Sequence, residues 1–178
     1  MPARKIERIY FYDIDGKGRL YHDGTLQDDI DFLDFFFERL KPNDTGMHDE
    51  YPYVSPCGRE MNFVRSSGAP IVFRKMDERQ NVLIFGGSLT FPWQPEKLVI
   101  GSDGQLYHPA PFLLGRISPE LLLEWQKYLD FNDGWVLRPE GPFSSLNTAR
   151  ELAAMDLALD QNLTLPHSDE KATTRGAT

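Results

Sequence analysis

The densest group of chemically versatile side chains lies within residues 55–63. Four different functional groups fall within six positions there: Cys57, Arg59, Glu60 and Asn62. Alternate side chains of a strand point to opposite faces, so we expect Glu60 and Asn62 to share one face. Arg59 can then bind a carboxylate or phosphate through two parallel hydrogen bonds. The alternative is structural: Arg59 and Glu60 form ion pairs that hold a loop, and Cys57 is a small buried residue.

Two histidines follow tyrosines near the ends of predicted strands, His22 and His108. A catalytic thiolate at Cys57 needs a base, which either histidine could supply across the fold. A histidine with nearby aspartates could also hold a metal, but no His-x-His or His-Glu-x-x-His spacing supports a metal site. The simpler reading is a hydrogen-bonded scaffold histidine. We therefore predict neither a metal nor a cofactor.

The two histidines end similar pentapeptides. Residues 18–22 read Gly-Arg-Leu-Tyr-His and residues 104–108 read Gly-Gln-Leu-Tyr-His, 86 positions apart, and each follows a turn rich in Gly and Asp. Two unrelated hairpins with similar turn chemistry explain this repeat. A duplication, which would place the two Tyr-His pairs at related positions, explains it as well.

These residues must be positioned by short strands and a helix. Aromatic and β-branched residues predict a strand at 9–14, and the turn at 15–18 returns the chain through 19–22 as a hairpin. Thr25 followed by Asp28 resembles a weak capping box, and apolar residues at helical spacing then predict a helix over 27–40.

Further strands are predicted at 62–64, 71–73 and 81–85, with a polar turn at 77–80. Residues 97–108 predict a second hairpin around a turn at 101–104. Ser118-Pro119-Glu120 is a strong helix start, because a hydroxyl cap precedes a proline at the first helical position. The Ala- and Leu-rich residues 144–163 also predict helix.

We accordingly predict an α+β fold: a mainly antiparallel sheet built from β-hairpins, with one central helix and C-terminal helices packed on it. A single domain is expected over residues 1–165, with helices at about 118–163. Residues 166–178 carry no apolar pattern and are predicted to be a disordered tail.

Composition excludes several classes of protein. The 178 residues include one Cys, 27 acidic and 19 basic side chains, for a formal charge of −8. One Cys cannot form an internal disulfide or a multi-cysteine zinc site. The negative charge disfavours bulk nucleic-acid and membrane-surface binding. No apolar run approaches the ~20 residues of a membrane span and no secretory signal is evident, which predicts a cytoplasmic protein.

The charge is uneven along the chain. Residues 59–79 hold five basic side chains against three acidic ones. The overall negative charge therefore leaves room for a small anion at one locally basic place. The five basic residues are Arg59, Arg65, Arg74, Lys75 and Arg79.

An ordered set of segments over about residues 8–111 resembles an uncharacterised protein family with human and bacterial members, known in animals as the chromosome 8 open reading frame 82 type. The resemblance implies no activity. Animal members look mitochondrial through an N-terminal extension that this chain lacks, which leaves a bacterial cytoplasmic protein or a processed form. The segments are Tyr10-Phe11-Tyr12, Gly18-x-Leu20, Phe32-Leu33-x-x-Phe36-Phe37-x-Arg39-Leu40-x-Pro42-Asn43, Cys57-Gly58-Arg59-Glu60-x-Asn62-Phe63, Pro70-x-Val72-Phe73, Gly86-Gly87 and Leu106-Tyr107-His108-Pro109-Ala110-Pro111.

The clustered polar residues without a complete catalytic set predict an accessory or binding protein. Its partner would be a small anionic ligand or another protein. One alternative is a hydrolase or transferase that uses Cys57 or Glu60 with His108. Another is a structural subunit of a larger assembly, which predicts an exposed apolar patch. The predicted ligand-binding residues are Arg59, Glu60, Asn62, Arg65, Tyr107 and His108.

Overall fold

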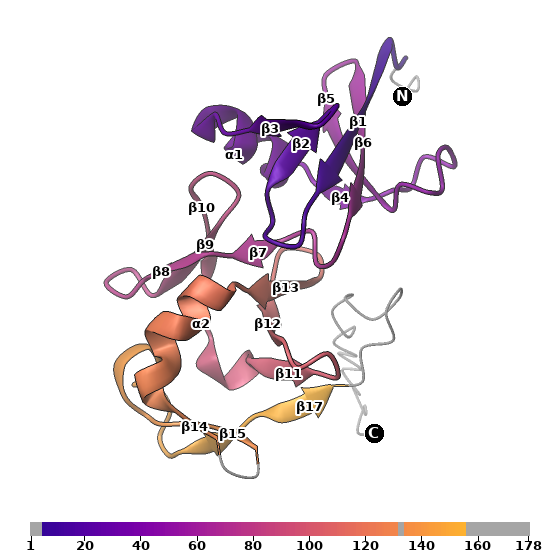
Figure 1. Ribbon diagram of the computed structural model, residues 1–178. Helices are drawn as coiled ribbons and strands as arrows, with labels where there is room; N and C mark the ends of the chain where they lie inside the picture. The colour runs from indigo at the N-terminus through magenta and orange to yellow at the C-terminus, as the bar shows by residue number, and fades with distance from the viewer. Residues whose placement is uncertain (1–4, 132–133, 156–178) are drawn as a thin grey trace, which may run out of the picture.

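The computed structural model of the protein describes residues 5–131 and 134–155. Most of the regular structure is strand, in mixed and antiparallel sheets, and the two α-helices are short: α1 (Ile30–Glu38) and α2 (Pro119–Trp125). Figure 1 shows a first sheet with α1 at one end of the molecule and a second sheet near α2 at the other. The predicted α+β class is confirmed in these broad terms.

The first sheet has the strand order β3-β2-β1-β6-β5-β4. Its central pair, β1 and β6, runs parallel, and its other pairs are antiparallel. Helix α1 packs on one face, where the ring centroids of Phe36 and Tyr12 are 4.8 Å apart and the Ser55 hydroxyl donates to the Phe36 carbonyl at 2.7 Å. The strands are β1 (Arg8–Ile14), β2 (Leu20–His22), β3 (Thr25–Gln27), β4 (Lys41–Pro42), β5 (Tyr53–Cys57) and β6 (Glu60–Ser66).

The start of α1 differs from the prediction. Thr25 is not its cap, because Thr25 lies in β3 opposite His22. The N-cap is Asp29, whose carboxylate accepts a hydrogen bond from the Phe32 amide at 2.8 Å. Both residues are good helix caps, and pairing of β3 with β2 decides between them.

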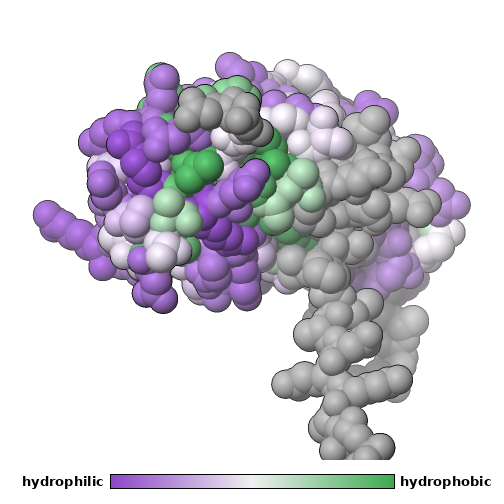
Figure 2. Space-filling view, turned by 90° about the horizontal axis from the view of Figure 1, so that it is seen from below, coloured by the Kyte–Doolittle hydropathy of each residue, from purple (hydrophilic) through white to green (hydrophobic). Residues whose placement is uncertain are grey.

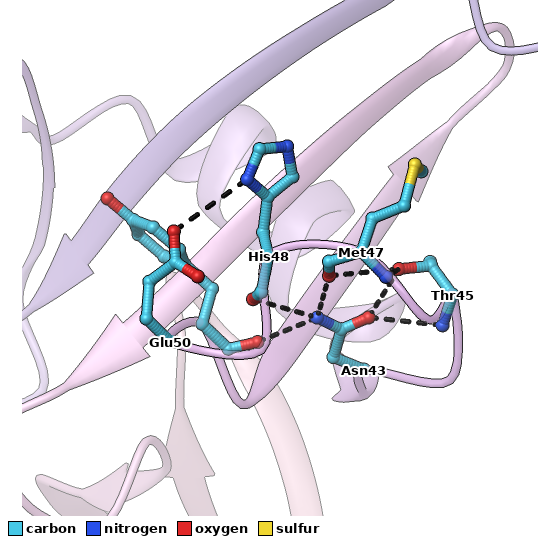
Figure 3. A network of polar contacts seen from close by, with 6 residues as sticks. Asn43, Thr45, Met47, His48 and Glu50 are labelled. Carbon is cyan, nitrogen blue, oxygen red and sulfur yellow. Dashed lines mark hydrogen bonds and ion pairs between the residues drawn. The ribbon is translucent and has the colours of Figure 1, made fainter.

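The loop between β4 and β5 is held by one side chain. The Asn43 amide donates to the carbonyls of Met47 and Tyr51, each at 2.8 Å, and its oxygen accepts from the Thr45 hydroxyl at 2.7 Å (Figure 3). The loop lays His48 and Tyr51 over Phe11 on the sheet. These bonds give the Pro42-Asn43 pair a structural role.

Residues 72–97, which we call the central stretch, connect the two ends of the molecule. They contain β7 (Val72–Phe73) and an antiparallel three-stranded sheet, followed by the 3-10 helix η1 (Pro95–Lys97). The predicted turn at 77–80 is confirmed, since the Asp77 carboxylate accepts from the amides of Arg79 and Gln80. The sheet is made of β8 (Lys75–Asp77), β9 (Val82–Phe85) and β10 (Leu89–Pro92).

The second large sheet has the order β17-β11-β12-β13-β7. Helix α2 follows it and begins where predicted: Ser118 is the N-cap, and its hydroxyl accepts from the Leu121 amide at 3.1 Å. The remaining strands form this sheet and a small antiparallel one, with 3-10 turns between them. They are β11 (Val99–Gly101), β12 (Leu106–Pro109), β13 (Leu114–Ile117), η2 (Gln126–Tyr128), β14 (Leu129–Phe131), β15 (Trp135–Leu137), η3 (Gly141–Phe143), β16 (Arg150–Glu151) and β17 (Ala153–Met155).

The predicted helix over 144–163 is wrong in its described part. Residues 150–151 and 153–155 are strands, and Ala153 pairs with Val99. Ala and Leu favour helix only weakly, and a free strand edge at β11 outweighs that preference. Residues 156–163 and the predicted tail at 166–178 lie outside the described residues.

The repeated pentapeptides occupy equivalent places. Tyr21 pairs with Asp13 in the first hairpin, and Tyr107 pairs with Val99 in the second, so both members shift by the same 86 positions. The turns match too: the Gly18 amide donates to Asp15 and the Gly104 amide to Gly101.

The elements around the two hairpins match as well. The series β1-β2-β3-α1 and β11-β12-β13-α2 have the same order, and a later strand pairs parallel with the first strand of each, β6 with β1 and β17 with β11. Similar turn chemistry alone would not produce this shared topology. The structure therefore favours the duplication. We call these units the first and second repeats.

One hydrophobic cluster runs through both repeats and the central stretch. It includes Phe36 and Phe37 of α1, Phe73 of β7, and Leu121 and Trp125 of α2. The two repeats therefore share a core.

Candidate functional site

The polar block predicted to form the site is a β-hairpin, with β5 and β6 joined at Gly58 and Arg59. Alternate residues of β6 place Glu60 and Asn62 on one face and Arg65 on the other. Arg59 lies in the turn, with three quarters of its side chain exposed (74%). The structure therefore brings Glu60 and Asn62 together, but not with Arg65.

The charged residues of this block are already paired. Arg59 contacts Glu7 at 2.5 Å, Glu60 contacts Arg8 at 2.9 Å, and Arg65 pairs with Asp13. These pairs connect β6 and its turn to β1 and the chain before it. Arg59 and Glu60 do form ion pairs, as the structural alternative expected, but with β1 and the chain before it rather than with a long loop. Exposed pairs of this kind contribute little stability.

Asn62 and Cys57 differ from these charged neighbours. Asn62 is buried, its amide donates to the Ser55 carbonyl at 2.9 Å, and its oxygen has no partner among the described residues. Cys57 is half-buried opposite Glu60. Within the described residues no hydrogen bond joins Cys57 or Glu60 to a histidine, so the geometry expected of a nucleophile and its base is not formed there.

Tyr107 and His108 lie on β12, in the second large sheet. The Tyr107 hydroxyl donates to Asp103 at 2.6 Å, and burial followed by this hydrogen bond raises the pKa of Tyr107. His108 is fully buried. Its Nε2 accepts from the Gln94 amide at 3.1 Å and its Nδ1 donates to the Pro109 carbonyl at 2.8 Å.

Burial lowers the pKa of His108 to about 4, so the ring is neutral at pH 7. Both ring nitrogens are engaged by the backbone, which leaves neither for a substrate or for Cys57. The six predicted ligand-binding residues thus occupy separate places in the two repeats, and the structure does not gather them into one pocket.

A cleft of about 370 Å³ opens instead between the first repeat and the central stretch. This volume lies within the range of small-molecule sites, roughly 300–1,000 Å³. The β1–β2 turn, β3 and the start of α1 line one part of it, and the central stretch lines the rest. The lining residues are Gly18, Arg19, Leu20, Leu26, Gln27, Asp28, Ile30, Leu33, Phe37, Arg74, Lys75, Ile84, Gly86 and Gly87.

The cleft is locally basic. Three of its side chains are cationic, Arg19, Arg74 and Lys75, and Asp28 is its one acidic lining residue. Arg19 pairs with Asp15 at 2.7 Å, and Arg74 donates to the Gly86 carbonyl. Within residues 5–131 and 134–155, neither Arg74 nor Lys75 forms an ion pair.

Hydrogen bonds fix one wall of the cleft to α1. The Asp34 carboxylate accepts from the Gly87 amide at 3.0 Å, from the Ser88 amide at 2.6 Å and from the Ser88 hydroxyl at 2.5 Å. Burial by itself would raise the pKa of Asp34, but these hydrogen bonds outweigh it and lower the pKa. A Cβ at Gly87 would lie 2.6 Å from the Ile30 carbonyl oxygen, so the close approach requires glycine.

Two other depressions are less suited to an anion. An open one of about 560 Å³ includes Lys5 and Arg59, but Glu7 lines it too and already pairs with Arg59. The other, beside α2, is an apolar groove of about 270 Å³. Figure 2 shows hydrophobic side chains gathered between polar ones on the face seen from below. The groove residues are Pro119, Leu122, Leu123, Gln126, Leu129 and Trp135.

Sequence reasoning found part of the cleft without recognising it. Arg74 and Lys75 belong to the locally basic stretch noted above, and Gly86-Gly87 directly follows the predicted strand at 81–85. Arg19 was missed, because nothing in the sequence shows that the β1–β2 turn lies beside Lys75. The basic stretch was the one available signal.

Some features common in functional sites are absent from the described part of the chain. Its His, Cys, Asp and Glu residues do not gather in threes as a metal site would need. None of its helices has the length and apolar character that crossing a membrane requires.

Comparison with known proteins shows a family and a fold. Residues 1–155 match the family described as "Domain of unknown function (DUF4505)". A crystal structure of a DUF1285 family protein from Shewanella baltica OS155 is 17% identical, with a TM-score of 0.51, covering 69% of this chain and 94% of that chain. A DUF1285 family protein from Silicibacter pomeroyi DSS-3 is 18% identical, with a TM-score of 0.48 and coverages of 74% and 76%. At this identity the first likeness concerns the fold alone.

Proposed function

We propose that this chain, which belongs to the DUF4505 family of domains of unknown function, is a binding protein for a small anionic ligand. The ligand would occupy the cleft between the first repeat and the central stretch. One observation carries the proposal: a cleft of about 370 Å³, in a protein whose formal charge is −8, is lined by two cations, Arg74 and Lys75, that form no ion pair among the described residues. A local positive site in an acidic protein attracts a small anion without attracting nucleic acid.

The lining favours binding over nucleophilic catalysis. It contains no histidine, cysteine or serine, and its single acid is Asp28. The ammonium group of Lys75 and the guanidinium group of Arg74 offer hydrogen-bond donors to carboxylate or phosphate oxygens.

The test is a titration with inorganic phosphate, followed through the amide signals of Lys75, Gly86 and Gly87 by nuclear magnetic resonance at low salt. We expect saturable shifts at these amides. Lys75→Gln, at an exposed side chain, should weaken binding by about tenfold, since one charge-assisted hydrogen bond contributes about 1.5 kcal/mol or more. Added salt should weaken binding further.

Arg79→Gln is the matched control, because Arg79 is an exposed cation of the same basic stretch outside the cleft. It should leave phosphate binding unchanged. Arg74→Gln should weaken binding too, but it also removes the bond to Gly86, so its fold must be checked by urea unfolding. Equal effects of Lys75→Gln and Arg79→Gln would contradict the proposal.

A further inference from the structure

We infer that the ligand of this cleft is amphipathic, an organic carboxylate or phosphate ester whose apolar body lies against the first repeat. The inference rests on the proposed function and names its ligand class. Two large apolar side chains from different elements carry it. Leu26 of β3 is 43% exposed and Ile30 of α1 is 58% exposed, and both line the cleft.

Single exposed apolar side chains are ordinary on protein surfaces and need no explanation. Here two of them border the same basic cavity. Beneath them the cavity is lined by the buried side chains of Leu20, Leu33 and Phe37. An inorganic anion would leave the exposed surface of Leu26 and Ile30 in contact with water, whereas an organic anion would cover it.

The exposed apolar side chains and the two cations without an ion pair come from different parts of the fold. Leu26 and Ile30 belong to the first repeat, while Arg74 and Lys75 belong to the central stretch. A molecule that contacts both must therefore carry its charge and its apolar surface on separate parts. The cleft volume, about 370 Å³, suits a small molecule.

The test uses straight-chain carboxylates on the full chain: acetate, hexanoate and decanoate, the last below the concentration at which it forms micelles. Each methylene that is fully buried should raise affinity roughly fourfold. Burial of three to four of its methylenes should therefore make decanoate bind roughly a hundredfold more tightly than acetate. The amide shifts of Gly86 and Gly87 report where it binds.

Single substitutions test the contacts to the apolar body and to the charged group of the ligand separately. Leu26→Asn should remove much of the gain in affinity from acetate to decanoate. Leu123→Asn is its matched control, since Leu123 is 69% exposed on α2, far from the cleft lining, and it should leave this gain unchanged. Lys75→Gln should weaken all three carboxylates by the same factor.

The outcomes distinguish the two proposals. If phosphate and all three carboxylates bind in the cleft with similar affinity, the amphipathic ligand is wrong and the anion site stands. If decanoate binds equally to the wild type, Lys75→Gln and Arg74→Gln, the anion site itself is wrong. Flotation with phosphatidylcholine–phosphatidylglycerol vesicles that is lost in Leu26→Asn would assign these residues to a membrane surface and overturn the small-molecule ligand.

Discussion

The two repeats contain the same Tyr-His pair in the same strand register, but the two histidines have opposite environments. His22 stacks on Tyr12 with ring centroids 4.8 Å apart, and a third of its side chain (32%) is exposed. His108 is fully buried, and both of its ring nitrogens bond to the backbone. The shared Leu-Tyr-His sequence therefore does not determine whether the histidine reaches solvent.

The difference comes from a segment that covers only the second repeat. The stretch from β10 to η1 places Phe91 and Trp93 against His108, with ring centroids 6.0 and 5.0 Å away, and Gln94 donates to its ring. In the first repeat, the equivalent hairpin instead borders the cleft through Gly18, Arg19 and Leu20. His108 is therefore enclosed in the second repeat, whereas the equivalent hairpin of the first repeat borders an open cleft.

The largest expected effect is the difference in stability lost when each of the two histidines is replaced by alanine. His108→Ala should lower the free energy of unfolding by about 3 kcal/mol, because it leaves a cavity and an unpaired buried amide at Gln94. His22→Ala should cost less than about 1 kcal/mol, as for most half-exposed residues. Urea unfolding of both variants measures this contrast. Losses within 0.5 kcal/mol of each other would contradict it.

The second largest expected effect is the loss of folding stability at low pH that the buried His108 causes. The pKa of His108 is about 4 when folded and about 6.5 when unfolded, so below pH 6.5 the unfolded chain takes up the proton first. Stability present above pH 6.5 is then lost as the pH falls toward 4, by up to about 3 kcal/mol. The control is His108→Gln, in which this group cannot titrate. Urea unfolding should show that the free energies of unfolding of the wild type and of His108→Gln come closer together as the pH falls from 6.5 to 4. A constant difference would show that His108 does not titrate as the structure implies.

The smallest expected effect is the difference in stability lost when each of the two turn glycines is replaced by alanine. Gly18 and Gly104 have φ angles of +78° and +75°, so alanine at either position costs about 1 kcal/mol in backbone strain. At Gly18 a Cβ would also lie 2.7 Å from the Val72 Cβ, whereas at Gly104 nothing lies within 4 Å. Gly18→Ala should therefore destabilise the protein by about 1–2 kcal/mol more than Gly104→Ala. Thermal unfolding compares the pair, and equal shifts would mean that the contact with Val72 relaxes freely.

Sequence reasoning succeeded where the signal is local. The Asp15 turn with Gly18, the Ser118-Pro119 helix start and the strand turn at Asp77 rest on bonds between residues at most four apart. It failed at Thr25, where pairing with the preceding strand β2 competes with helix capping, and at residues 150–155, where the distant edge of β11 competes with helix preference. Such competition depends on which strands lie free, and local sequence does not show that.

The candidate site illustrates the same division. Residue types alone identified a locally basic stretch and a repeated Gly-x-Leu-Tyr-His motif, because charge and turn chemistry belong to the residues themselves. Tertiary structure decided that Arg59 pairs with Glu7, that His108 is buried, and that Arg19 shares a cleft with Lys75. The physical reason is that burial and proximity come from contacts between segments distant in the chain, here the first repeat and the central stretch, whose relative placement the shared core sets.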